Sequence, residues 1–243
     1  MCNQNSAFRG CFRLLPVIFV ATLLGACAQT NSFTHEGFEN KDGAPATVLL
    51  MPPDVEVYEL SAAGIPEPRA DWTKQARENV HRTLNKVLRA QQATMRSYDL
   101  KDDPIEAVHP RHRQLVKLHE RVGESIRRHQ YPTPYKLPTK DGKFDWTLGK
   151  GVVRLRNDYD ADYALFVHFR DSFSSSGRVV VIAAAALIGV SVQGGQQAGF
   201  ASLVDLGTGQ IVWFNVMSSS TGDLRKLEPA MRASEALLDE VPL

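Results

Sequence analysis

The sequence predicts an α/β (α+β) domain: a mixed sheet flanked by helices, with one helical insert and one apolar insert. Short apolar runs alternate along the chain with longer segments of helical periodicity, and this order favours a sheet covered by helices. Two of the runs, 200–206 and 210–217, are separated only by Gly207-Thr208-Gly209, a spacing typical of a hairpin. The hairpin makes part of the sheet antiparallel, so the predicted sheet is mixed.

The first predicted strand is 47–51, a continuous apolar run that Pro52 and Pro53 end. The helix with the clearest periodicity is predicted over 72–92. Asp71 suits its N-cap, because a carboxylate there accepts the free amide hydrogens of the first turn. The apolar side chains of this helix recur on one face, and they are Trp72, Ala76, Val80, Leu84, Val87 and Leu88.

A helical insert is expected over about 100–157, after a short strand at 94–98. Its main helix is predicted over 104–129, and three prolines make 131–138 a loop. A short helix is then predicted from Asp145 to about residue 156. The main helix carries a narrow apolar stripe formed by Leu115, Leu118, Val122 and Ile126. Its many arginines are interpreted as a solvated face, and contact with anionic lipid headgroups is the alternative.

A central strand is predicted over 163–169, which is rich in aromatic residues, and 172–177 breaks it. The apolar insert, 179–192, follows and is too short to span a bilayer as a helix. We interpret it as a buried or interface helix; the alternative is exposed apolar surface for oligomerisation or bilayer contact. Its candidate interface residues are Val179, Val180, Val181, Ile182, Leu187, Ile188 and Val190. A last helix is predicted after Asp223, which would cap it.

The N-terminus has the pattern of a secretory signal peptide, predicted over 1–26. Arg9 and Arg13 precede the uncharged apolar run 14–24, and small residues follow it. This run is shorter than the roughly 20 residues that a spanning helix needs, so it does not predict a permanent anchor.

The Leu-Gly-Ala-Cys motif that ends at Cys27 resembles the lipobox of bacterial lipoproteins. In these proteins the cysteine thiol receives a diacylglycerol, and the chain is cut just before it. The resemblance implies that Cys27 is lipidated. Because Ala28 is not an aspartate, it also implies transfer to the outer membrane of a Gram-negative host, facing the periplasm. Residues 27–46 are polar and are predicted to be a lipidated tether, followed by a single domain over 47–243.

Cysteine usage agrees with this interpretation. Cys2 and Cys11 both lie in the predicted signal peptide, so the mature chain would keep only the acylated cysteine. No intramolecular disulfide is therefore expected.

Several segments together resemble a family of envelope lipoprotein domains. An Asp-Ala-Asp-Tyr motif at 160–163 opens the central strand, and Asp-Leu-Gly-Thr-Gly at 205–209 forms the hairpin turn. With the strand 47–51 and the helix 72–92, these motifs resemble the α/β domain of the curli-secretion lipoprotein. The N-terminal domain of the Tol-system periplasmic protein and the lipoprotein activators of penicillin-binding proteins are similar too. The resemblance implies this fold and an envelope role, and the insert 100–157 departs from the small versions. The chain is also similar to uncharacterised lipoproteins of proteobacteria.

The sequence holds fragments of catalytic and metal-binding motifs, and each is incomplete. His119-Glu120 lacks the second histidine of H-E-x-x-H, and Ser191 lies in a G-x-S-x-G pattern with one residue too many. Neither a metal site nor a cofactor is predicted. The fragments that we interpret as structural also include His109, His112, His168, Asp158, Asp160 and Asp162.

We therefore expect a non-catalytic binding or assembly factor of the cell envelope, held at the outer membrane by lipid. Its expected contacts are the membrane, an envelope protein and, as a further option, copies of itself. The formal net charge of +1 argues against nucleic-acid binding. Two alternatives stay open. One is an envelope hydrolase, which a cleft with paired carboxylates or a Ser/His pair would indicate, and which His168 beside a serine and an acid would favour. The other is an oligomeric secretion or pore subunit.

Overall fold

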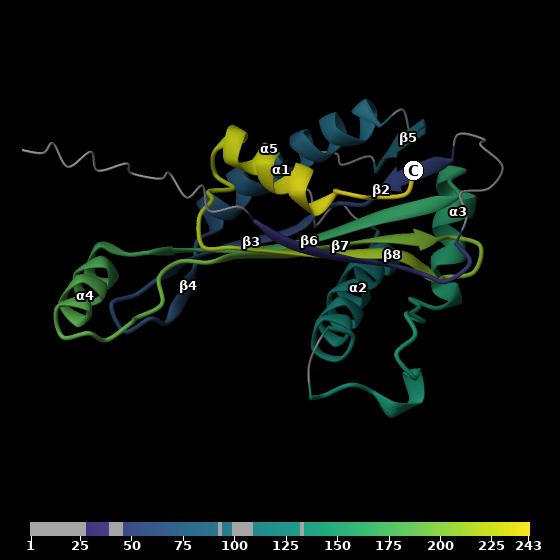
Figure 1. Ribbon diagram of the computed structural model, residues 1–243. Helices are drawn as coiled ribbons and strands as arrows, with labels where there is room; N and C mark the ends of the chain where they lie inside the picture. The colour runs from purple at the N-terminus through teal and green to yellow at the C-terminus, as the bar shows by residue number, and fades with distance from the viewer. Residues whose placement is uncertain (1–27, 39–45, 92–93, 99–108, 132–133) are drawn as a thin grey trace, which may run out of the picture.

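The centre of the protein is a mixed sheet with helices on both faces (Figure 1). The computed structural model describes residues 28–38, 46–91, 94–98, 109–131 and 134–243. Within these residues the sheet has eight strands, in the order β1-β8-β7-β6-β2-β5, with β3 and β4 beside the far half of β6. The predicted α/β class with a mixed sheet is confirmed.

The strands are β1 (Gln29–Thr34), β2 (Thr47–Leu50), β3 (Asp54–Leu60), β4 (Pro66–Pro68), β5 (Thr94–Ser97), β6 (Tyr163–Ser174), β7 (Gln197–Asp205) and β8 (Ile211–Ser219). In the half of the sheet ordered β1-β8-β7-β6, each strand is antiparallel to its neighbour. Both β2 and β3 run parallel to β6, because the two prolines after β2 interrupt one extended segment. β2 lies along the start of β6, and β3 lies along its end.

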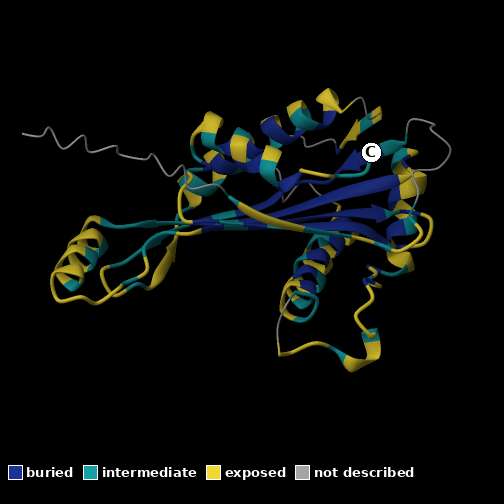
Figure 2. Ribbon diagram, in the orientation of Figure 1, coloured by how far each residue is buried: buried dark blue, intermediate teal, exposed yellow. Residues whose placement is uncertain are grey.

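Two layers of helices cover the sheet (Figures 1 and 2). Helices α1 (Ala70–Ala90) and α5 (Leu227–Leu237) share one hydrophobic core with Leu165, Val167 and Phe169 of β6. Helices α2 (Pro110–His129) and α3 (Val153–Tyr159) cover the opposite face, where Ala164 and Phe166 point. This alternation along β6 follows from the two-residue period of a strand.

The predicted helical insert forms the second of these helical layers. Its described part contains α2, α3 and the short 3₁₀ helices η2 (Pro138–Lys140) and η3 (Lys150–Val152). The apolar stripe predicted on α2 is largely inward, with Ile126 fully buried, but Leu118 is 40% exposed. The segment is therefore part of the domain core, although residues 99–108 lie outside the described part.

Several local predictions are wrong; among them, the helix predicted from Asp145 begins only at Val153. Gln29–Thr34 pairs with β8, so part of the predicted tether is an ordered edge strand of the sheet. Asp71 lies within α1, and the N-cap residue Arg69 makes no side-chain capping hydrogen bond. Asp223 does not cap α5, which begins four residues later; its carboxylate pairs with the Arg225 side chain instead. For Gln29–Thr34 and Asp223, a tertiary partner replaces the role that the local sequence suggests.

One end of the sheet continues into a projecting arm (Figure 1). β6 does not end at residue 169 as predicted; it runs on to Ser174 and leads into helix α4 (Ser176–Leu187). The turn between β3 and β4, residues 61–65, lies beside it, and residues 188–195 return to β7. We call residues 61–65 and 175–195 the arm. Among the described residues, no helix has the length and apolar character needed to cross a membrane.

Candidate functional site

The apolar insert is a helix, as predicted, but it is not buried in the domain. Helix α4 has no buried residue, and Leu187 is 89% exposed. The other large apolar side chains exposed in this segment are Val179, Val180, Val181, Ile188 and Val190. Among the candidate interface residues, Ile182 is half-buried. The possibility that the run is a buried core helix is therefore wrong, and its use as an interface stays a prediction.

The local sequence specifies this helix at both ends. The Ser175 side chain caps the N-terminus by accepting a hydrogen bond from the Arg178 amide, at 3.2 Å. At the C-terminus Gly189 adopts a φ of +75°, and the amide of Val190 donates to the carbonyl of Ala185 at 2.9 Å. This is the Schellman arrangement, in which glycine supplies the left-handed residue. The local sequence thus determines where this exposed apolar helix begins and ends, and capping hydrogen bonds form at both ends.

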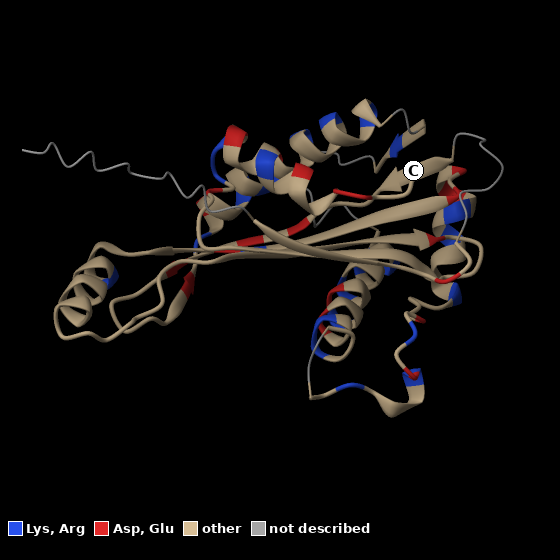
Figure 3. Ribbon diagram, in the orientation of Figure 1, with Lys and Arg blue, Asp and Glu red and all other residues tan. Residues whose placement is uncertain are grey.

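The arm carries almost no charge. Between Asp171 and Asp205 the sequence has one charged residue, Arg178, and Figure 3 shows the arm largely free of blue and red. The Arg178 guanidinium donates to backbone carbonyls of Ala62 at 3.4 Å and Gln193 at 2.8 Å, so it ties α4 to the rest of the arm. The facing turn adds Ile65, whose side chain is also exposed. An aliphatic, uncharged surface of this kind binds apolar groups and offers nothing for acid–base chemistry.

A small polar cleft of about 200 Å³ lies where the arm joins the sheet. Asp171 is its one carboxyl group; the side chain is 1% exposed and accepts hydrogen bonds from the Leu224 amide and the Gln197 side chain. Burial, with Asp223 nearby, raises the pKa of Asp171 to about 6 despite these two bonds. The lining residues are Asp171, Ser172, Phe173, Ser174, Gly195, Gln196, Gln197, Ser220, Thr221 and Gly222.

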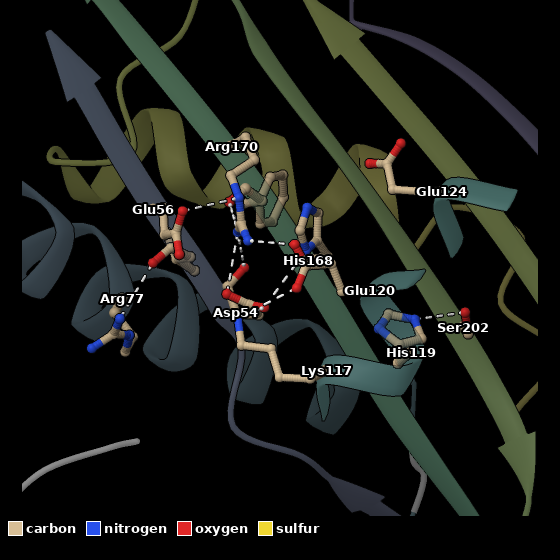
Figure 4. Close-up of polar contacts among 12 residues, drawn as sticks. Asp54, Glu56, Arg77, Lys117, His119, Glu120, Glu124, His168, Arg170 and Ser202 are labelled. Atoms are coloured by element: carbon tan, nitrogen blue, oxygen red, sulfur yellow. Dashed lines mark hydrogen bonds and ion pairs between the residues drawn. The ribbon is translucent and has the colours of Figure 1, made fainter. Parts of the chain in front are cut away.

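An ionic cluster around the buried Asp54 joins α2 to the sheet (Figure 4). Asp54 opens β3 and is 3% exposed; its carboxylate lies 3.2 Å from Lys117 Nζ and 3.2 Å from Arg170 Nη1. Glu120 contacts the same two cations at 3.4 Å each. Burial alone would raise the pKa of Asp54, but the nearby His168 and the two cations hold it well below its usual range. The cluster stabilises the position of α2 on the sheet.

Two histidines beside this cluster resemble parts of a hydrolase relay without forming one. His168 Nδ1 lies 3.8 Å from an oxygen of Asp54, whereas the neighbouring serine, Ser202, pairs with His119 at 2.8 Å. Burial lowers the pKa of His119 to about 3, so this ring is neutral at ordinary pH. Acid and serine thus contact different histidines, and the cleft at the arm base includes neither pair. The Ser202–His119 pair is fully buried and lies outside that cleft.

The remaining histidine and aspartate candidates have structural partners. His112 contacts the Tyr98 hydroxyl at 2.9 Å and Asp158 at 3.4 Å, and His109 caps α2. Asp160 pairs with Arg96 at the end of α3. Asp162 pairs with Arg156, and Ser191 is an exposed residue after α4. Within the residues that the structure describes, no group of three or more potential ligands could hold a metal ion.

Asp54 and Asp171 were not among the candidate residues predicted from the sequence. The prediction that Cys27 is lipidated is not tested by the structure. Cys27 lies outside the described residues. For Asp171 a signal existed, because it continues the inward series of Val167 and Phe169 at two-residue spacing. An acid at an inward strand position is expected to have a shifted pKa. Asp54 follows two prolines, and nothing in that local pattern indicates burial.

No protein-family model matches the chain, and a comparison with curated proteins finds no match. Among solved structures, the chain is similar to the PelC dodecamer from Paraburkholderia phytofirmans in space group P6. That match has a TM-score of 0.37 and 10% sequence identity, and it covers 87% of this chain and 96% of that chain. A PelC dodecamer from the same organism with one leucine-to-methionine substitution matches at a TM-score of 0.36 and 10% identity, over 86% and 96%. TM-scores this low do not establish a common fold.

Proposed function

We propose that the protein is an outer-membrane lipoprotein of the envelope group that it resembles, acylated at Cys27, and that it acts as a non-catalytic binding or assembly factor. The observation that carries the proposal is the arm, which contains a capped helix with solvent-exposed apolar side chains. Large exposed apolar patches mark surfaces that contact another body, either protein or membrane. The lipobox-like motif supports a location at the outer membrane, where envelope proteins and lipid are both within reach.

The anchor is tested by labelling cells with a palmitate analogue and recovering the full chain through a C-terminal tag. We expect the label on the parent protein and on a Cys11→Ala variant, because Cys11 lies in the predicted signal peptide. The Cys27→Ala variant should lose both the label and its place in the outer-membrane fraction. An unlabelled parent, or a labelled Cys27→Ala variant, would contradict the proposed anchor.

The assembly role is tested by crosslinking in intact cells through the same tag. We expect discrete envelope proteins that are recovered with the parent and absent from an untagged strain. Loss of every specific partner would contradict the assembly role. Light scattering of the detergent-purified protein addresses the alternative of an oligomeric secretion or pore subunit, which a monomer would exclude.

A further inference from the structure

The chain enters the sheet at the same end from which the arm projects. In the strand register Gln29 lies opposite Ser218, which lies opposite Ala198, which lies opposite Arg170. That row is next to Asp171, three residues before β6 ends and the arm begins. Cys27 precedes Gln29 by two residues, which span at most about 7 Å of extended chain. A lipid on Cys27 would therefore be held close to the base of the arm.

We infer that α4 and the facing turn 61–65 insert into the leaflet that holds the Cys27 lipid, so that membrane hydrocarbon covers the apolar surface of the arm. This inference rests on the proposed function for the lipid itself. The arm would then act as a second attachment to the same membrane. Acylation brings the chain to the bilayer, and insertion of the arm determines how the domain stands on it.

The dimensions of α4 fit a single leaflet. Its 12 residues rise about 18 Å, whereas the hydrocarbon core of a bilayer is about 30 Å thick, so one leaflet provides about 15 Å. The helix is too short to span and long enough to use the depth of one leaflet. Arg178 lies in its first turn with its guanidinium on backbone carbonyls, and an arginine there can keep its charge near the headgroups.

The chemistry of the tip favours lipid over a protein partner. From Val179 to Ile188 every side chain is aliphatic, so this stretch offers a partner neither hydrogen-bonding side chains nor aromatic anchors. Protein interfaces carry about one hydrogen bond per 100–200 Å² and concentrate their energy in Trp, Tyr and Arg. A helix that is apolar on all sides also needs a medium that surrounds it, and one flat partner surface does not.

The test places a fluorescent probe on the arm of the full-length, processed protein. Ala184→Cys introduces a thiol on an exposed face of α4, and Lys150→Cys introduces one near the β7–β8 turn, at the opposite end of the sheet. Each thiol is labelled with an environment-sensitive nitrobenzoxadiazole probe, and the protein is reconstituted into phosphatidylethanolamine–phosphatidylglycerol vesicles. Nitroxide-labelled lipids report contact with hydrocarbon. We expect a blue shift and quenching of the Ala184→Cys probe and neither for the Lys150→Cys probe.

A charge on the tip should reverse the insertion. Adding Leu187→Asp to the probed protein should shift the inserted-to-exposed ratio by at least about tenfold, because an aspartate is costly in hydrocarbon. The matched control is Leu227→Asp on α5, an exposed leucine outside the arm, which should leave quenching unchanged. Quenching that survives Leu187→Asp would overturn the inference.

Two further outcomes would also overturn it. The Ala184→Cys probe could stay aqueous in vesicles, or it could become shielded without lipid quenching as the protein concentration rises. The second result would assign the arm to a second copy of the chain. Mass spectrometry of the N-terminal peptide from the same sample reports the lipid on Cys27 independently. An acylated chain with an aqueous arm leaves the proposed anchor standing, whereas a quenched arm on an unacylated chain removes the anchor and keeps the insertion.

Discussion

The buried carboxyl at the base of the arm makes the stability of the protein depend on pH in an unusual direction. Asp171 has its pKa raised from 3.8 to about 6 by burial. The folded protein therefore holds this proton more tightly than the unfolded chain does. The contribution is fully present below about pH 4 and is lost as the pH rises through 6. Each pKa unit corresponds to about 1.4 kcal/mol, so ionising the buried group costs about 3 kcal/mol of folding free energy.

The perturbation that isolates this effect is Asp171→Asn. The amide has nearly the same shape and keeps an oxygen that accepts the Leu224 and Gln197 hydrogen bonds, but it cannot ionise. We expect the variant to gain stability relative to the parent as the pH rises, with the difference moving by about 3 kcal/mol between about pH 4 and about pH 8. Urea unfolding followed by circular dichroism at several pH values measures this difference directly.

A neighbouring carboxyl provides a control of opposite sign. Burial alone would raise the pKa of Asp223, but the Arg225 side chain at 2.7 Å outweighs burial and lowers it. Its contribution is therefore present above about pH 4 and is lost as the pH falls further. Asp223→Asn should cost stability at neutral pH, where Asp171→Asn should add it. A pH-independent difference for Asp171→Asn, or a loss of stability at high pH, would refute the reasoning.

Three further substitutions test the packing described above. Gly123→Ala should lower the melting temperature and cost about 1–3 kcal/mol, although alanine favours helices, because its Cβ would lie 2.1 Å from the Phe200 ring; a higher melting temperature would contradict this. Asp54→Ala should cost about 1–3 kcal/mol in urea unfolding, since Arg170 loses its buried partner but keeps Glu120, and a neutral result would show that water replaces the carboxylate. Leu187→Asp should change unfolding free energy by no more than about 0.5 kcal/mol, because that side chain is exposed; a larger loss would mean that α4 packs on the domain.

The elements that the sequence predicts correctly are those with local causes. The hairpin turn forms as expected because the Asp205 carboxylate accepts hydrogen bonds from the amides of Gly207 and Thr208, at 2.7 and 3.1 Å. The long helix forms because its apolar spacing matches the 3.6-residue period and its inner residues reach the core. The wrong predictions involve a choice between partners. Asp223 had an arginine within reach, and Gln29–Thr34 had the free edge of β8.

The candidate site was harder to predict because its apolar residues are exposed and its charged residues are buried. The most apolar run of the domain, around Val180, forms a helix with no buried residue, whereas the charged residues Asp54 and Asp171 are almost fully buried. Hydropathy measures whether a side chain prefers water or an apolar environment. Whether it is buried also depends on where the strands of the sheet end. β6 runs past the edge of the helical layers, so whatever follows Ser174 is carried away from the core. Strand length is a tertiary property, and no local pattern around Ser172 indicates it.

The same geometry determines what the arm can transmit. β6 is continuous from the core into the arm, and its first half is covered on both faces by helices. Helix α4 follows the end of this strand after one residue. The lipid on Cys27 and the arm would then contact the membrane at two separate points. Two points of contact restrict the orientation of the domain more than one lipidated chain does. The diacylglycerol already gives a stable anchor, and it would hold the arm at a high effective concentration near the leaflet. The β7–β8 turn and Lys150 would then face away from the bilayer.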